Sequence, residues 1–286
     1  MSLRLARRLT AAASPLDPVS DALQSAVKAL PKPVRDVLDG VWLGAPLHPA
    51  ATDVPLGAWT AAAVLDATGA MTGSESLGYA ADASLAVGVL GALPAAATGL
   101  NDWSHLRGES KRLGTLHALL NSTSLALNVA SLVLRRSGRR DVARALSLAA
   151  YGGTVFSAHL GGILSFGLGV RVNRTAFESP SDEWQSVLDD TELVGEAMVR
   201  VEVDGEPALV TRAADGRICA IASRCTHLGG PLEQGERHGD VVTCPLHGSD
   251  FDVCTGDVVA GPAVFPQPSY ESRVRDGRIE LRPRRD

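Results

Sequence analysis

Apolar residues are concentrated in four long stretches within the first 170 positions, and the last third of the chain alternates apolar and polar positions instead. The four stretches cover about residues 53–71, 79–100, 114–134 and 142–170. Each is close to or above the ~20 residues that a helix needs to cross the hydrocarbon core of a bilayer. They are rich in Ala, Gly, Ser and Thr, as closely packed membrane helices are. The pattern predicts four transmembrane helices, with a soluble helical bundle as the alternative.

The N-terminal arm, residues 1–45, carries a weaker helical pattern. Residues 17–30 place apolar side chains on one side at helical spacing. These side chains are Val19, Leu23, Ala26, Val27 and Leu30. The segment predicts a short amphipathic helix on the inner membrane surface, with an ordinary soluble helix as the alternative. Arg7-Arg8 is similar to a twin-arginine signal, but no apolar segment follows it, so we expect no cleaved signal.

Basic residues outside the stretches predict the orientation, because cytoplasmic loops carry an excess of Lys and Arg. The arm, the second loop and the tail are basic through Arg4, Arg7, Arg8, Lys28, Lys32, Arg35, Arg107, Lys111, Arg112, Arg171 and Arg174. The loop 72–78 has no basic residue, so we expect both termini in the cytoplasm. The third loop is an exception, with four arginines between positions 135 and 140. We expect Asp66 and Asp82, near the outer helix ends, to attract them.

Polar side chains line one face of the third predicted helix. They are His117, Asn121, Ser124, Asn128 and Ser131, at spacings of four, three, four and three. Polar groups in a membrane helix face the bundle interior or a cavity. Together with His48 and His159, the pattern predicts a second site, at which two of His48, His117 and His159 hold a b-type haem or a quinone binds. Helix–helix hydrogen bonding is the alternative.

From Thr191 onward the period of two predicts a small antiparallel β domain. Ala197–Val203 and Pro207–Arg212 are expected strands joined by a tight turn at Asp204-Gly205. Further hairpin turns are expected at Asp215-Gly216 and Asp276-Gly277. Residues 173–190 show no sustained period and are expected to be a linker.

Two short motifs in the β domain carry the chemistry. Cys225-Thr-His227 is followed, after residues 228–243, by Cys244-Pro-Leu-His247. One Cys and one His in each motif suit a cluster in which two thiolates hold one iron and two imidazoles hold the other. A structural zinc site is the alternative, because Cys and His at short spacings also bind zinc.

The stretch resembles a Rieske [2Fe–2S] domain of the ferredoxin type over about residues 190–284. The resemblance implies that Cys225 and Cys244 hold the inner iron and that His227 and His247 hold the outer iron and form the electron exit. It also implies that the cluster has no substrate pocket of its own. Rieske oxygenases add a large domain with two His and a carboxylate on a mononuclear iron. Only 39 residues follow His247 and none is His, so we expect no self-contained oxygenase.

Departures from the Rieske subunits of respiratory bc complexes indicate an intermediate to low reduction potential. Those subunits carry an extra Cys in each loop, where this chain has Gly230 and Leu246. Phe251 stands where they have a Tyr, although Ser249 remains as a donor to the cluster.

Composition adds little beyond exclusions. The formal net charge of −5 gives no electrostatic reason for nucleic-acid binding. Four cysteines, two of them assigned to the cluster, do not make a disulfide framework, and Cys219 and Cys254 are expected to be buried small residues in β-structure. His238 is expected to be a solvated loop residue. Pro46–Pro49, Asp53–Gly57 and Asn101–Trp103 resemble an uncharacterised (DUF2231-like) family of small four-helix membrane proteins, which implies topology and no chemistry.

The sequence therefore predicts two domains, an all-α four-helix transmembrane bundle followed by an all-β Rieske-type domain. The expected boundaries are 1–45 for the arm, 46–172 for the membrane domain, 173–190 for the linker and 191–286 for the [2Fe–2S] domain. The expected function is single-electron transfer between an unidentified redox partner protein and a quinone pool or haem, as a component of an oxidoreductase system. The expected location is the cell membrane, multi-pass, with the Rieske domain in the cytoplasm. The alternatives are a membrane-tethered redox or iron–sulfur sensor and a zinc-stabilised interaction module.

Overall fold

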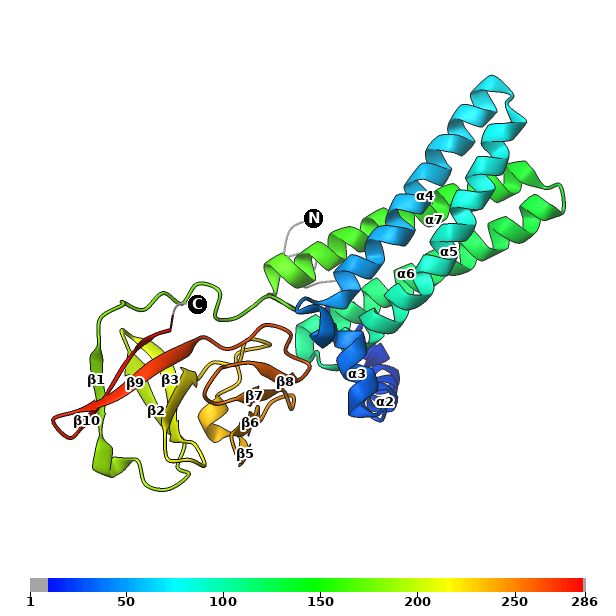
Figure 1. Cartoon of the computed structure of the whole chain (residues 1–286). Coiled ribbons are helices and arrows are strands. Elements are labelled where there is room, and N and C mark those ends of the chain that lie inside the picture. Colours follow the sequence, from blue (N-terminus) through cyan, green and yellow to red (C-terminus); the bar gives the residue numbers. More distant parts are fainter. Residues whose placement is uncertain (1–9, 285–286) are drawn as a thin grey trace. The chain divides into compact units, whose positions relative to one another are not determined.

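The computed structural model describes residues 10–284, which form a helical unit and a β unit (Figure 1). The helical unit takes residues 10–31 and the segment Leu47–Val170. The β unit takes Lys32–Pro46 and the chain from Arg171 onward. Arg4, Arg7 and Arg8 of the predicted arm lie outside the described residues.

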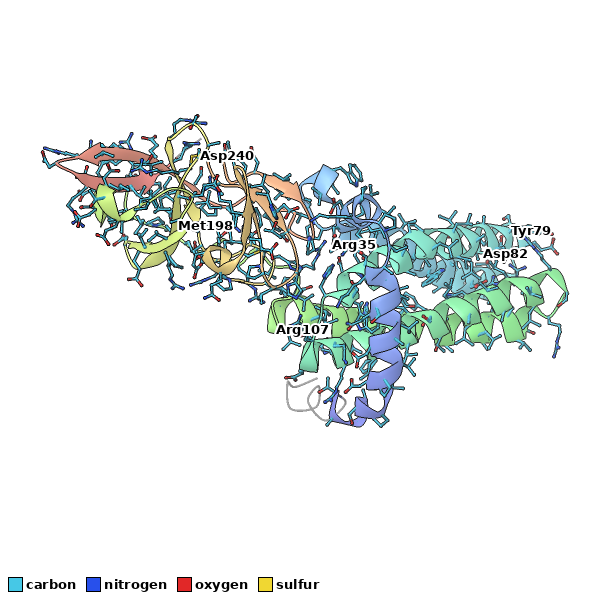
Figure 2. All side chains as sticks on the ribbon, turned by 90° about the horizontal axis from the view of Figure 1, so that it is seen from below. Arg35, Tyr79, Asp82, Arg107, Met198 and Asp240 are labelled. Atoms are coloured by element: carbon cyan, nitrogen blue, oxygen red, sulfur yellow. A yellow bond between two sulfur atoms is a disulfide. The ribbon has the colours of Figure 1, made fainter. Side chains whose placement is uncertain are left out.

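Four long helices run alongside one another in the helical unit (Figure 1). They are α4 (Leu47–Thr72), α5 (Glu75–Ser104), α6 (Gly108–Arg136) and α7 (Arg140–Gly162), and a π-helical turn, η3 (Ile163–Gly167), follows α7. Each coincides with one of the four apolar stretches and extends beyond it by a few residues, except that the helical structure after α7 ends before 170. Figure 2 labels Tyr79 and Asp82 at one end of the bundle and Arg107 at the other.

The bundle buries polar side chains among apolar ones such as Trp59 and Leu85, and it also exposes many apolar side chains. Its buried residues include Ser124, Asn128 and Ser131, which confirms that this face of α6 points inward. The outward-facing apolar side chains occur on all four helices and include Val64, Leu90, Leu93, Val133, Leu148 and Phe156. Two helices, α5 and α6, are long and apolar enough to cross a membrane by length and composition.

Shorter helices precede the bundle, so the helical region holds more than the four helices that were predicted. They are η1 (Ser14–Leu16), α2 (Asp17–Lys28), α3 (Lys32–Asp39) and η2 (Val41–Leu43). α2 confirms the helix expected within residues 17–30, and its apolar residues Val19 and Leu23 are exposed. The buried positions of α2 are instead Ser20 and Gln24, because the Gln24 amide donates to the carbonyls at the end of α5.

The β unit consists of a six-stranded and a four-stranded antiparallel sheet. The first sheet has the order β1 (Gln185–Asp189), β10 (Arg278–Pro283), β9 (Ser269–Arg275), β4 (Ile218–Ala222), β3 (Glu206–Arg212) and β2 (Val199–Val203). The second has the order β5 (Glu236–His238), β6 (Val241–Thr243), β7 (Asp250–Asp252) and β8 (Val258–Ala260). Two short 3₁₀ turns, η4 (Asp190–Glu192) and η5 (Leu232–Gln234), lie between strands.

The predicted hairpin turns are present. Asp204-Gly205 joins β2 to β3 and Asp276-Gly277 joins β9 to β10, with both residues of each pair at positive φ. Positive φ at both positions matches the right-handed twist of the paired strands.

Two parts of the predicted boundaries differ from the structure. The range 173–190 was expected to be a linker, but Gln185–Asp189 form β1, which pairs with β10. The range 1–45 was expected to be one arm, but Lys32–Pro46 belongs to the β unit. The pairing of β1 with β10 and the packing of Lys32–Pro46 in the β unit each join segments that are far apart in the sequence. The residue pattern near either segment therefore does not predict them.

Candidate metal centre

Two loops with the same hydrogen-bond pattern carry the four predicted ligands. In the first, the Cys225 N–H donates to the Gly230 carbonyl and the Gly229 N–H donates to the Cys225 carbonyl, both at 2.8 Å. In the second, the Cys244 N–H donates to Ser249 at 2.7 Å and the Gly248 N–H donates to Cys244 at 3.0 Å. In each loop the backbone N–H and carbonyl of the cysteine are thus hydrogen-bonded to residues four or five positions later.

Glycines are required at the turns of these loops. Gly229 and Gly248 adopt φ values of +77° and +73°, which residues other than glycine rarely adopt. A Cβ at Gly230 would lie 2.7 Å from the Cys244 Sγ, so the two loops approach each other closely at this point.

The four side chains form a pair of thiols and a pair of imidazoles. The Cys225 and Cys244 thiols contact each other, both are buried, and neither is in a disulfide. The His227 and His247 rings lie 5.1 Å apart between centroids and are perpendicular. His227 is 6% exposed, whereas His247 is half-buried.

Backbone amides stabilise the thiolate form of both cysteines. The N–H groups of His227 and Leu228 face the Cys225 sulfur, and those of Leu246 and His247 face the Cys244 sulfur. The N–H groups of Gly229 and Gly248 donate instead to the carbonyls of Cys225 and Cys244.

The hydrogen bond between the two thiols shifts their pKa values in opposite directions. The hydrogen bond from the Cys225 thiol lowers the pKa of Cys244 to about 6, although burial opposes this shift. The same hydrogen bond, together with burial, raises the pKa of Cys225. The pair therefore readily provides one thiolate, and a bound cation would favour the second.

This donor set fits an iron–sulfur cluster. Two thiolates on one side and two imidazoles on the other are the ligands of a [2Fe–2S] centre with mixed coordination. Among residues 10–284, no three His, Cys, Asp or Glu side chains are grouped closely enough to hold a single metal ion.

A third segment, residues 261–263, supports the second loop. The Ala263 N–H donates to the Ser249 hydroxyl at 2.9 Å, and Ser249 is fully buried. Phe251, on β7, is also fully buried and packs in one hydrophobic cluster with Cys225 and Cys244. The Pro-rich segment after the second loop is therefore part of the frame of the site.

Cys219 and Cys254 form a disulfide, so the expectation that they are separate buried residues was wrong. The bond joins β4 of the large sheet to the turn between β7 and β8 of the small sheet. The pairing was not readable from the sequence, because the two cysteines have a sequence separation of 35. His238 is exposed, as expected, but it lies in strand β5 rather than in a loop.

The histidines predicted for a second site do not all come together. His48 and His117 are neighbours, with ring centroids 6.3 Å apart. The His117 Nδ1 lies 2.8 Å from the Ser157 carbonyl and its Nε2 lies 3.1 Å from the Asn121 amide, whereas the His48 Nδ1 lies 2.9 Å from the Ala95 carbonyl. His159 is exposed. The structure thus joins two of the three and leaves His159 on the outer surface of the bundle.

Sequence reasoning missed several polar side chains around the loops. Lys32 and Asp36 of α3 contact the second loop and Gly261, and Arg171 contacts Pro262. The only sequence signal was a cluster of charged residues, which is ordinarily solvated.

Comparison with protein families gives two matches. The model of the "Rieske [2Fe-2S] domain" matches residues 183–271. The model of the "Predicted membrane protein (DUF2231)" family matches residues 44–174. The first range lies in the β unit, and the second lies for the most part in the helical unit.

Several relatives are ferredoxins. The chain is 36% identical over 77 residues to ferredoxin CarAc of Metapseudomonas resinovorans, which covers 27% of this chain and 71% of that protein. It is 31% identical to the ferredoxin component of the naphthalene 1,2-dioxygenase/salicylate 5-hydroxylase systems of a Ralstonia species, over 30% of this chain and 81% of that protein. Among solved structures, the ferredoxin of carbazole 1,9a-dioxygenase from Nocardioides aromaticivorans is 31% identical over 35% of this chain and 98% of that chain, with a TM-score of 0.33.

Proposed function

Because this chain belongs to the Rieske [2Fe–2S] family, we propose that it is a membrane-anchored carrier of single electrons. Residues 183–271 form the Rieske domain, which binds one [2Fe–2S] cluster, and residues 44–174 form a DUF2231 domain. When bound, the cluster supplies one-electron oxidation and reduction. The pairing of two thiols and two imidazoles on two equivalent loops is the observation that carries the proposal.

The roles of the four side chains follow from their chemistry and burial. Cys225 and Cys244 hold the inner iron, because thiolates suit a buried ferric ion. His227 and His247 hold the outer iron as neutral imidazoles. His247 is the more accessible of the two histidines and provides the exit for the electron.

Anchoring in the bilayer is supported by the arrangement of side chains in the helical unit. Leu90, Leu148 and Phe156 face outward, whereas Asn128 and Ser131 are buried. The outward-facing apolar side chains carry the argument, because a soluble bundle presents mainly polar side chains to water. α4 to α7 would then be the four spans, and the exposed apolar side of α2 would lie in the headgroup region.

Orientation has two candidates. The basic arm and tail favour cytoplasmic termini, and two of the four arginines of the third loop, Arg135 and Arg140, are compensated by pairing with Asp82. The Cys219–Cys254 disulfide favours the outer side, because disulfides persist mainly in oxidising compartments. We propose the cytoplasmic orientation. Labelling of a single cysteine introduced at exposed Asp276, in intact cells with a membrane-impermeant maleimide, distinguishes the two: protection supports it and labelling favours the outer side.

The partners follow from the class of relatives and from the membrane domain. The ferredoxins to which the chain is similar are components of oxygenase systems by name. A redox protein that docks near His247 is the proposed soluble partner. A quinone is the proposed partner in the membrane, next to His48 and His117; haem ligation by this pair is the alternative.

A spectrum of the purified full chain in detergent tests the proposal. We expect cluster absorption that bleaches on addition of a quinol, and a Soret band in addition if haem is bound. Bleaching that occurs only with dithionite would favour the sensor alternative, in which the helices transmit a change of cluster state. Zinc without acid-labile sulfide would favour the interaction module.

A further inference from the structure

The segment Lys32–Pro46 contacts the second cluster loop through a lysine. The Lys32 Nζ lies 2.8 Å from the carbonyl of Gly248, the residue after His247, and 2.9 Å from the Asp250 Oδ2. Its side chain is only partly exposed. A fixed positive charge is therefore held beside a ligand-bearing loop.

The same segment contacts residues 261–262 through a carboxylate. The Gly261 N–H donates to the Asp36 Oδ1 at 3.0 Å. A Cβ on Gly261 would lie 3.0 Å from Val41 and 3.1 Å from Asp36, so the segment is closely packed against this turn. Because the turn also supports Ser249 through Ala263, the segment is connected to the frame of the site.

Arg171 completes the contact between the segment and the loops. Its guanidinium donates to the carbonyls of Pro262 and Asp39, both at 2.7 Å, and pairs with the Asp39 carboxylate at 3.2 Å. Arg171 and Asp39 are both buried. Pro46, Arg171 and His227 line one cavity of about 10 Å³, which is room for a single water. Lys32–Pro46 and Arg171 together are called the loop cover.

We infer that the loop cover sets the reduction potential of the cluster through the fixed charges of Lys32 and Asp36; the inference rests on the proposed ligation by the two loops. Reduction adds one negative charge, so a nearby cation favours the reduced state and a nearby carboxylate opposes it. The cover also excludes bulk water from the His227 side, where a low local dielectric lengthens the reach of both charges. Lys32 raises the potential and Asp36 lowers it.

Redox titration of the full chain, followed by electron paramagnetic resonance, tests the inference with two variants. Lys32→Gln is expected to shift the equilibrium about threefold towards the oxidised cluster, a potential lower by about 30 mV at 59 mV per tenfold for one electron. Asp36→Asn is expected to raise the potential by a similar amount, because an amide oxygen can still accept from Gly261. Lys32→Arg keeps the charge and is expected to keep the potential.

Matched controls carry the same changes of charge on the β9–β10 hairpin, whose tip lies at the far end of the β unit from β7 and β8 (Figure 1). They are Arg275→Gln and Asp276→Asn, at exposed positions, and both are expected to leave the potential unchanged. Shifts of Lys32→Gln and Asp36→Asn in the same direction, or no shift in either, would overturn the inference. A wild-type protein without a cluster signal would instead refute the proposed function.

Discussion

Arg135 of α6 and Asp82 of α5 form an ion pair, with the Nη1 2.7 Å from the Oδ1, and the same guanidinium also pairs with Asp66 of α4. The Arg135 side chain is 1% exposed. Arg140 and Arg144 join the network through Asp82 and Asp66. The sequence had predicted that these two aspartates attract the four arginines of the third loop. The structure confirms this for Arg135 and Arg140, whereas Arg136 and Arg139 are exposed.

Removing one partner of this network is expected to destabilise the helical unit. Arg135→Gln leaves Asp66 and Asp82 with less compensation in a buried site, which costs about 3–5 kcal/mol when a buried pair is broken. Thermal unfolding in detergent, followed by the helical circular dichroism signal, measures the effect. The matched control is Arg136→Gln, at the exposed next position. Equal stabilities of the two variants would contradict the structural role of the network.

Replacement of both bridging cysteines by serine is expected to lower the stability of the β unit. The Cys219–Cys254 bond closes a loop with a sequence separation of 35, and a disulfide of this kind contributes about 2–4 kcal/mol. Chemical unfolding of the double variant measures the loss. The number of reactive thiols in denatured, unreduced protein provides the control: two of the four cysteines are expected to react. Four reactive thiols would mean that the bond does not form.

Stability is expected to depend on pH through Glu178. Burial, and secondarily Glu206, raise the pKa of Glu178 above its usual value of 4.5. A carboxyl with a raised pKa in the folded state favours folding while it is protonated, so this contribution is present below about pH 4.5 and is lost as the pH rises through the folded pKa.

Glu178→Gln replaces the carboxyl with a neutral amide that does not ionise. The variant is therefore expected to melt at a higher temperature than the wild type at about pH 8, and this difference is expected to be smaller at about pH 5. Calorimetric scans at both pH values measure the gain. Glu183→Gln, at an exposed position nearby, is the control and is expected to show no such dependence. A gain that does not change with pH would contradict this account of Glu178.

Histidine variants inside the bundle and on its surface are expected to differ in their effect on stability. His117→Ala removes the contacts with Ser157 and Asn121 and is expected to cost about 1–3 kcal/mol, because their buried polar groups lose a partner. His159→Ala, at an exposed position on α7, is expected to be close to neutral. Thermal unfolding of both variants in one detergent measures the difference, and the reverse order would show that the two helices face the other way.

Local patterns in the sequence were sufficient for the long helices, the hairpin turns and the two loops that bring the predicted ligands together. The C-x-H and C-x-x-H motifs, the Asp-Gly turns and the apolar stretches each act within a few residues, and these features are present in the structure. The inward face of α6 was also readable, because its polar residues repeat at helical spacing.

Contacts between distant segments were not readable from the sequence. The pairing of β1 with β10, the Cys219–Cys254 bond and the loop cover each join residues separated by 35 positions or more. The packing of the polar side of α2 against the bundle was also not readable from the sequence. The Gln24 amide donates hydrogen bonds to backbone carbonyls at the end of α5, and the sequence of α2 alone does not indicate these partners.

Electron paramagnetic resonance of the dithionite-reduced full chain, with iron and acid-labile sulfide measured on the same sample, tests the central claim most directly. The account predicts two irons and two sulfides per chain. It also predicts a one-electron signal that is lost in Cys244→Ala and kept in Cys219→Ser. A preparation that contains zinc and no labile sulfide, or a signal that survives Cys244→Ala, would contradict it.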